Sequence, residues 1–220
     1  MKKSVYSLVL ADAVVEAIDQ MAYRKGTSRS NLINQILAEQ VSCITPEMRM
    51  RDIFGQLERL VSDTFQIQQQ PSDAMLSLKS SLKYKYKPTI RYSVEINRQM
   101  EDTVGELRVA FRTQSTQLLA VLKDFFVLWA NLEHKYIARY FAGRKISYTI
   151  DGGRLTRSLM MPDQAERQTD EALGEAIAEY ITMFDDVLKT YFSYADNPAE
   201  AARKAEERYC GYLKQGIRFI

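Results

Sequence analysis

The side chains best equipped for chemistry form a polar set within one short alternating segment. Arg91, Ser93 and Glu95 occupy every second position, and apolar residues lie between them. Successive side chains of a β-strand point to opposite faces, so these three would share one face. A guanidinium, a hydroxyl and a carboxylate together donate and accept several hydrogen bonds, which suits recognition of a polar partner.

A basic run precedes this set. All charged residues from Lys79 to Val94 are basic, and lysine alternates with tyrosine over 83–87. This alternation predicts that the strand extends backward with its lysines on one side. A solvated linker is the commoner meaning of such a run. Its position directly before the strand favours the alternative, contact with an anionic backbone.

Residues that could support catalysis or bind a metal are few. His134 is the only histidine, and Cys43 and Cys210 lie far apart. The sequence has no Walker loop, no glycine-rich dinucleotide turn and no Ser-His-Asp set. We therefore expect no enzymatic activity, no metal site and no cofactor.

The first forty residues contain three local signals in succession. Residues 5–10 are β-prone, and residues 11–25 carry apolar side chains at helical spacing. Gly26 stops this helix, and Thr27 or Ser28 can cap a second helix that runs to Val41. A strand and two short amphipathic helices cannot bury their apolar faces alone, so we expect a second strand to pair with the first.

This order of strand, helix, Gly-x-Ser-x-Ser turn and helix, over residues 3–42, resembles the ribbon-helix-helix repressors of the Arc, MetJ and CopG type. The resemblance implies an antiparallel two-stranded ribbon that enters the major groove of double-stranded DNA. It also implies a sequence-specific DNA-binding regulator, above all a transcriptional repressor. Plasmid partition and relaxosome accessory roles occur in the same family.

The resemblance assigns roles to the outward side chains of the first unit. Because the bulkier face of the strand should be buried, the outward set that it would place against bases is Val5, Ser7 and Val9. It places Lys3 on the DNA backbone. Amide groups at the start of the second helix, at Ser28, Arg29 and Ser30, suit a phosphate.

The outward valines leave a second interpretation open. Valine can meet a thymine methyl group, but it lacks the paired donors that discriminate strongly between bases. The alternative is a protein-interaction module, antitoxin-like or an assembly protein, whose ribbon face is covered by a protein partner such as a toxin.

A shift of 86 positions lays a second segment over the first without a gap, and the apolar positions repeat. We interpret residues 89–128 as a degenerate second copy, with a helix over 98–112 and strand 90–96 paired to strand 4–10 of the same chain. Pairing between two chains, or an unrelated strand followed by helices, is the alternative. In this copy the expected base-reading residues are Arg91, Ser93 and Glu95, and the expected phosphate contacts are Lys85 and Lys87.

The predicted fold class is therefore mainly α, with tandem ribbon-helix-helix units and an added C-terminal hairpin and helices. The expected segments are a ribbon-helix-helix unit, a helix with a basic linker, a second such unit with a long helix, and a C-terminal hairpin with helices. Their bounds are 1–43, 44–88, 89–142 and 143–220. The last segment would regulate, bind a protein partner or form a homo-oligomer.

Composition limits the partners. The chain has 220 residues, 46% of them hydrophobic, so it can bury a full core, and its net charge of +2 provides no global field for a polyanion. DNA affinity must therefore come from local basic groups. The two distant cysteines suit a reducing cytoplasm, no apolar run approaches about 18 residues, and the first residues lack a signal-peptide pattern. We expect a cytoplasmic protein without a membrane contact.

Overall fold

The chain falls into two units, Met1–Arg49 and Met50–Ile220. The computed structural model describes residues 5–68, 74–84, 87–100, 103–141, 143–161, 169–217 and 220.

The first unit consists of an extended segment and two helices. Residues 5–11, all of them described, form no regular secondary structure, and they lead into α1 (Asp12–Arg24). Gly26 has a φ of 61°, a conformation that glycine adopts without strain, and it ends the first helix before α2 (Arg29–Gln40) begins. Both helices were predicted, and both are confirmed, whereas the strand predicted over residues 5–10 is not formed in this chain.

Helix α3 (Pro46–Val61) begins in the first unit and ends in the second. Proline suits the first turn of a helix, and the Thr45 hydroxyl accepts a hydrogen bond from the Met48 amide at 3.2 Å. Its later turns bury apolar side chains in the second unit, among them Ile53 and Leu57. The helix was predicted from this spacing and is confirmed.

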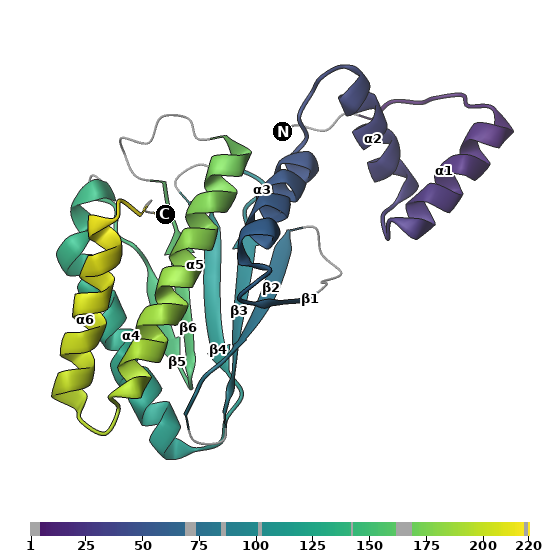
Figure 1. Ribbon diagram of the computed structural model, residues 1–220. Coiled ribbons are helices and arrows are strands. Elements are labelled where there is room, and N and C mark those ends of the chain that lie inside the picture. Colours follow the sequence, from purple (N-terminus) through teal and green to yellow (C-terminus); the bar gives the residue numbers. More distant parts are fainter. Residues whose placement is uncertain are drawn as a thin grey trace. The chain divides into compact units, whose positions relative to one another are not determined.

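The second unit is built on a six-stranded antiparallel sheet (Figure 1). The strands follow the order β1-β2-β3-β4-β6-β5, so the two edges are β1 and β5. Their bounds are β1 (Gln66–Gln68), β2 (Met75–Ser81), β3 (Thr89–Ile96), β4 (Gly105–Phe111), β5 (Tyr148–Asp151) and β6 (Arg154–Leu159). Both edge strands are shorter than the four strands between them.

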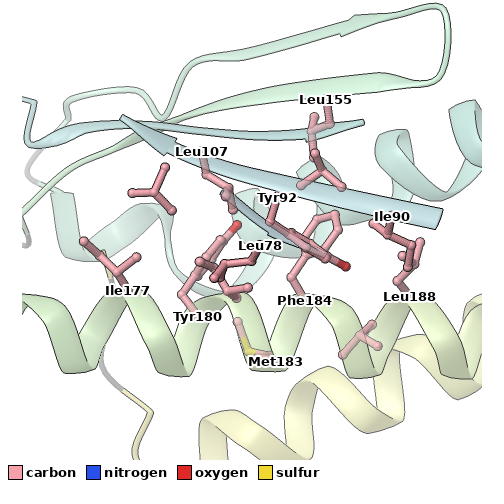
Figure 2. Close-up of a cluster of buried hydrophobic side chains, with 14 of the residues drawn as sticks. Leu78, Ile90, Tyr92, Leu107, Leu155, Ile177, Tyr180, Met183, Phe184 and Leu188 are labelled. Atoms are coloured by element: carbon pink, nitrogen blue, oxygen red, sulfur yellow. The ribbon is translucent and has the colours of Figure 1, made fainter. Parts of the chain in front are cut away.

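Helices cover one face of this sheet, and no described helix of the second unit lies on the other, which we call the open face (Figure 1). The helices are α4 (Thr116–Tyr136), the short 3₁₀ helix η1 (Ala138–Phe141), α5 (Asp170–Ser193) and α6 (Pro198–Lys214). Inward side chains of β2, β3, β4 and β6 meet the apolar stripe of α5, as Figure 2 shows for Tyr92 and Phe184. Helix α6 packs on this layer, since the Trp129 and Tyr209 rings lie edge to face at 5.3 Å.

The predicted fold class is wrong. The structure is mixed α/β, with N-terminal helices, a six-stranded antiparallel sheet and C-terminal helices, and it contains no tandem ribbon-helix-helix units in the part that it describes. Strand 90–96 lies inside β3, which pairs with β2 on one side and β4 on the other. Both of its edges are therefore occupied, so it is not the partner of segment 4–10.

The predicted helix over 98–112 is also wrong, because residues 105–111 form β4. Met100, Val104, Leu107 and Phe111 recur at helical spacing, but the apolar residues Leu107, Val109 and Phe111 also alternate with more polar ones. Close approach of two strands decides between these patterns. A Cβ added at Gly105 would lie 2.0 Å from the Glu95 carbonyl oxygen, so glycine lets β4 lie against β3.

Residues 143–220 belong to the same core as β2–β4. The predicted hairpin is confirmed as β5 and β6. Strand β6 pairs directly with β4, although α4 lies between these two strands in the sequence. The predicted long helix is confirmed as α5, capped by Thr169, and the last helix as α6, capped by Asn197. The capping box expected at Asp163 and Glu166 lies outside the described residues.

Contact between α3 and α5 depends on one glycine and gives a first prediction. A Cβ added at Gly174 of α5 would lie 2.5 Å from the Ile53 carbonyl oxygen of α3. Gly174→Ala should therefore lower the free energy of unfolding by about 1–3 kcal/mol, as overpacked sites do. Urea denaturation measures this change.

The matched control is Gly211→Ala in α6, where an added Cβ has no neighbour within 4 Å. That change should instead stabilise the protein by about 0.5–1 kcal/mol, because alanine favours a helix interior. Equal effects of the two substitutions would contradict close α3–α5 packing.

Candidate nucleic-acid interface

Every residue of the extended N-terminal segment is exposed. Val5 and Val9 are exposed at 100% and 102% and Tyr6 at 88%, whereas Leu8 and Leu10 are exposed at 52% and 38%. The outward set expected from the sequence, Val5, Ser7 and Val9, is thus exposed, but so is Tyr6 of the opposite set. We call residues 5–10 the arm.

The turn after α1 presents the start of α2. The Ser28 hydroxyl accepts a hydrogen bond from the Asn31 amide at 3.2 Å, so Ser28 is the N-cap of α2. Arg29 forms an ion pair with Asp19 of α1, and Ser30 is exposed. The positive end of a helix dipole lies here, but phosphate binding at these residues stays a prediction. Lys3 lies outside the described residues.

The first unit leaves most of its large apolar side chains uncovered. Among its described residues, the buried apolar side chains are Ala22, Leu32 and Ala38. The exposed large apolar residues come from the arm, both helices and the connection to α3: Val5, Tyr6, Leu8, Val9, Leu10, Val14, Met21, Tyr23, Ile36, Leu37, Val41 and Ile44. A surface this apolar is typical of an interaction site.

The second set of expected contacts lies in the second unit, on the open face of the sheet. Arg91, Ser93 and Glu95 share the outward side of β3, as the alternation predicted. The Ser93 and Ser77 hydroxyl oxygens lie 3.0 Å apart in a hydrogen bond, and Glu95 pairs with Arg108 of β4 at 2.9 Å. These residues belong to a broad six-stranded surface, which cannot enter a major groove as a two-stranded ribbon would. Contact of these three residues with DNA stays a prediction, and it would be made by the face of a sheet and not by a two-stranded ribbon.

The neighbouring lysines of the β2–β3 connection are placed in part. Lys87 is exposed and has a φ of 43°, which is uncommon for a residue with a side chain. Lys85 lies outside the described residues. A phosphate contact of either lysine stays a prediction.

The strand register brings further cations together on the open face, an arrangement that the sequence did not predict. Lys79 of β2 lies opposite Arg91, and Arg154 of β6 lies opposite Ala110 of β4, the other neighbour of Arg91. Alternation in residues 105–111 was the signal that could have revealed β4. The pairing of β4 with β6 spans a whole helix, and no local pattern reveals it.

A second polar cluster is sealed inside the second unit. The Arg157 guanidinium donates to both Glu133 carboxylate oxygens, at 2.9 and 3.3 Å, and the Tyr148 hydroxyl donates to the same carboxylate at 2.6 Å. Arg157 also lies 4.5 Å over the Tyr180 ring. Both charged residues are buried, so a substrate has no access to the cluster.

The described ranges contain no group of three or more His, Cys, Asp or Glu residues that could hold a metal ion. In the same ranges no helix combines the length and the apolar character that crossing a membrane needs.

Comparisons with protein-family models, with curated proteins and with solved structures found no match to this chain.

Proposed function

We propose that this protein is a sequence-specific DNA-binding regulator, a transcriptional repressor, whose first unit acts as a dimer. The arms of two copies would pair as an antiparallel ribbon and enter the major groove. The observation that carries the proposal is the arm itself, a short, largely apolar segment that is exposed along its whole length and has no partner strand among the described residues. Pairing between two chains replaces the pairing within one chain expected from the sequence.

A second copy would supply the core that the first unit lacks. Three small or medium apolar side chains are buried among its described residues, and a unit of about 40 residues rarely folds stably without a further partner. Each large apolar side chain that a second copy covers contributes about 1.5–3 kcal/mol. The exposed apolar residues of the arm, α1 and α2 would thus contact the same residues of the second copy.

The remaining contacts follow from the same arrangement. The amides at Ser28, Arg29 and Ser30 would hold a phosphate and set the orientation of the ribbon, and Lys3 would add a charge near the backbone. We place this activity in the cytoplasm, where the free thiols of Cys43 and Cys210 stay reduced. The proposal includes no catalytic step.

One observation favours a second candidate function. The two outermost side chains of the arm, Val5 and Val9, are apolar and fully exposed, and neither can form hydrogen bonds with a base. A protein-interaction module would use them differently, because a protein partner would cover this side of the arm. The experiment below distinguishes the two functions.

Adjacent residues of the arm provide a matched pair of variants. Leu8→Ser changes the side expected to face the second copy, so it should dissociate the dimer and abolish sequence-specific binding. Val9→Ser changes the outward side, so it should leave the dimer intact and alter only which duplexes are preferred. Analytical ultracentrifugation measures the first property, and selection from a random duplex pool measures the second.

Three results would count against the repressor. A dimer that survives Leu8→Ser would show that the arm does not hold it together. A selected pool without any sequence preference would argue for the protein-interaction module. An unchanged preference in both variants would show that the arm does not read the sequence.

A further inference from the structure

Three cations lie in one row across the open face of the sheet. In register, Lys79 of β2 lies opposite Arg91 of β3, Arg91 opposite Ala110 of β4, and Ala110 opposite Arg154 of β6. Lys79, Arg91 and Arg154 form what we call the basic row. Neighbouring strands are about 4.8 Å apart, so the row spans about 14 Å.

The charges of this row are not neutralised within the described part of the chain. No ion pair there joins any of the three to an acidic residue, although Asp151 lies across from Arg154 on β5. One row away the pattern differs, since Arg108 pairs with both Glu95 and Glu106. Like charges directly opposite on neighbouring strands destabilise a sheet. Lys79 and Arg91 therefore weaken the sheet unless an anion lies over them.

More cations surround the same end of the sheet. Lys83 follows β2, Lys87 precedes β3 and Arg112 follows β4, and all three are exposed. In Figure 1 the β2–β3 connection and the end of β4 lie at one end of the strands. The basic row thus lies beside a wider basic margin.

The other outward residues of the open face indicate which kind of polyanion could bind the basic row. The described outward positions carry no aromatic ring, which proteins that bind single strands use to stack bases. Met75 is their one large apolar side chain, too little for insertion into a membrane. Hydroxyl groups flank the row instead, among them Ser77, Ser93 and Thr156. Lysine, arginine and hydroxyl side chains are the usual donors to DNA phosphates.

We propose that the basic row is a second DNA-binding surface, which contacts the phosphate backbone of a duplex without reading its sequence. Its span of about 14 Å matches a major groove about 12 Å wide, so the cations at its ends reach phosphates on both sides. Arg91 then acts as a backbone contact and not as a base-reading residue. The surface belongs to the second unit alone, so it stands or fails separately from the ribbon of the first unit.

The test neutralises the row in the full-length protein. The variant K79Q/R91Q/R154Q loses three phosphate contacts, and each contributes about 0.9 to the slope of log affinity against log salt. The slope for a random duplex should therefore fall by about 2.7. Between 50 and 200 mM salt, the weakening of binding should be about 40-fold smaller than in the unchanged protein.

Two further variants make the result specific. The control R98Q/K145Q/K214Q removes the same charge from exposed positions outside the row, and it should keep the original slope. Arg91→Glu places an acid opposite Lys79, so it should raise the melting temperature while it weakens duplex binding. A purely structural role for Arg91 would move both in the same direction.

The outcomes separate this inference from the proposed function. An unchanged slope in K79Q/R91Q/R154Q, with Leu8→Ser still abolishing sequence preference, overturns the second surface alone. A lower slope in that variant, with no effect of Leu8→Ser, supports the second surface and overturns the ribbon. Binding to vesicles of anionic lipid but not to a duplex overturns the inference.

Discussion

Arg157→Met should lower the free energy of unfolding by about 3–5 kcal/mol, because the Glu133 carboxylate would stay buried without its cationic partner. The two side chains are 1% and 0% exposed, and two hydrogen bonds join them. Helix α4 carries the acid and strand β6 the base. Chemical denaturation, with circular dichroism as the signal, measures the loss.

Two comparisons test the cause of that loss. Adding Glu133→Leu to Arg157→Met removes the orphaned charge, so it should restore most of the lost stability. Arg203→Met breaks ion pairs on the surface of α6, where solvent screens them, and should have a small effect. If Arg157→Met proves no more harmful than Arg203→Met, the buried ion pair does not stabilise this core.

The protein should lose stability steeply above pH 10. Burial raises the pKa of Tyr92, Tyr180 and Tyr209 well above the ordinary tyrosine value. Asp185 raises the pKa of Tyr92 further, whereas for Tyr180 and Tyr209 the opposing effects of Glu133 and Arg157 are smaller than that of burial. In the unfolded chain these hydroxyls ionise near pH 10, so above that pH the unfolded state releases protons that the folded state keeps. Their contribution is fully present below pH 10 and is lost as the pH rises. The loss is about 1.4 kcal/mol per pH unit for each tyrosine, roughly 4 kcal/mol for the three.

Tyr209→Phe tests this pH dependence at one position. The Tyr209 hydroxyl is buried and forms no hydrogen bond within the described residues, so its removal should not lower stability at neutral pH. The loss above pH 10 should become about 1.4 kcal/mol per pH unit smaller. Denaturation series at increasing pH, with tyrosinate absorbance followed in parallel, measure both. An unchanged pH dependence would mean that Tyr209 ionises in the folded protein.

Local patterns were enough to predict the helices and one hairpin. Helices α3, α4, α5 and α6 each combine an apolar stripe with a capping or turn signal, and the glycine pair at 152–153 predicts the β5–β6 turn. In these segments the local preference and the final packing agree. The local sequence was therefore enough to predict that these segments form helices and a hairpin, without knowledge of any long-range contact.

The sheet could not be predicted in the same way. Residues 98–112 satisfied a helical spacing and a strand alternation together, and pairing with β3 and β6, which no local pattern reveals, decides for the strand. The 86-residue repeat rested on apolar positions, which any two amphipathic segments can share. The first of the two segments matched in this repeat forms the arm, α1 and α2, whereas the second forms β3, β4 and the first part of α4.

The candidate site was predicted in part for the same reason. Alternation correctly placed Arg91, Ser93 and Glu95 on one side of a strand, because that pattern is local. Lys79 and Arg154 join Arg91 through pairing between strands, which depends on the order of the sheet. Without the strand order, the sequence gives the three basic residues but does not show that they lie in one row.

The two short edge strands have a consequence for colloidal behaviour. A long, flat edge offers unpaired amides and carbonyls to another molecule, and such edges promote aggregation. Here β1 has three residues and β5 four, so each edge offers only a brief template. If two copies are held together through the arm, their sheets come to a high local concentration, yet neither edge is long enough to extend the neighbouring sheet. Self-association can then stop at a defined size without growing into fibres.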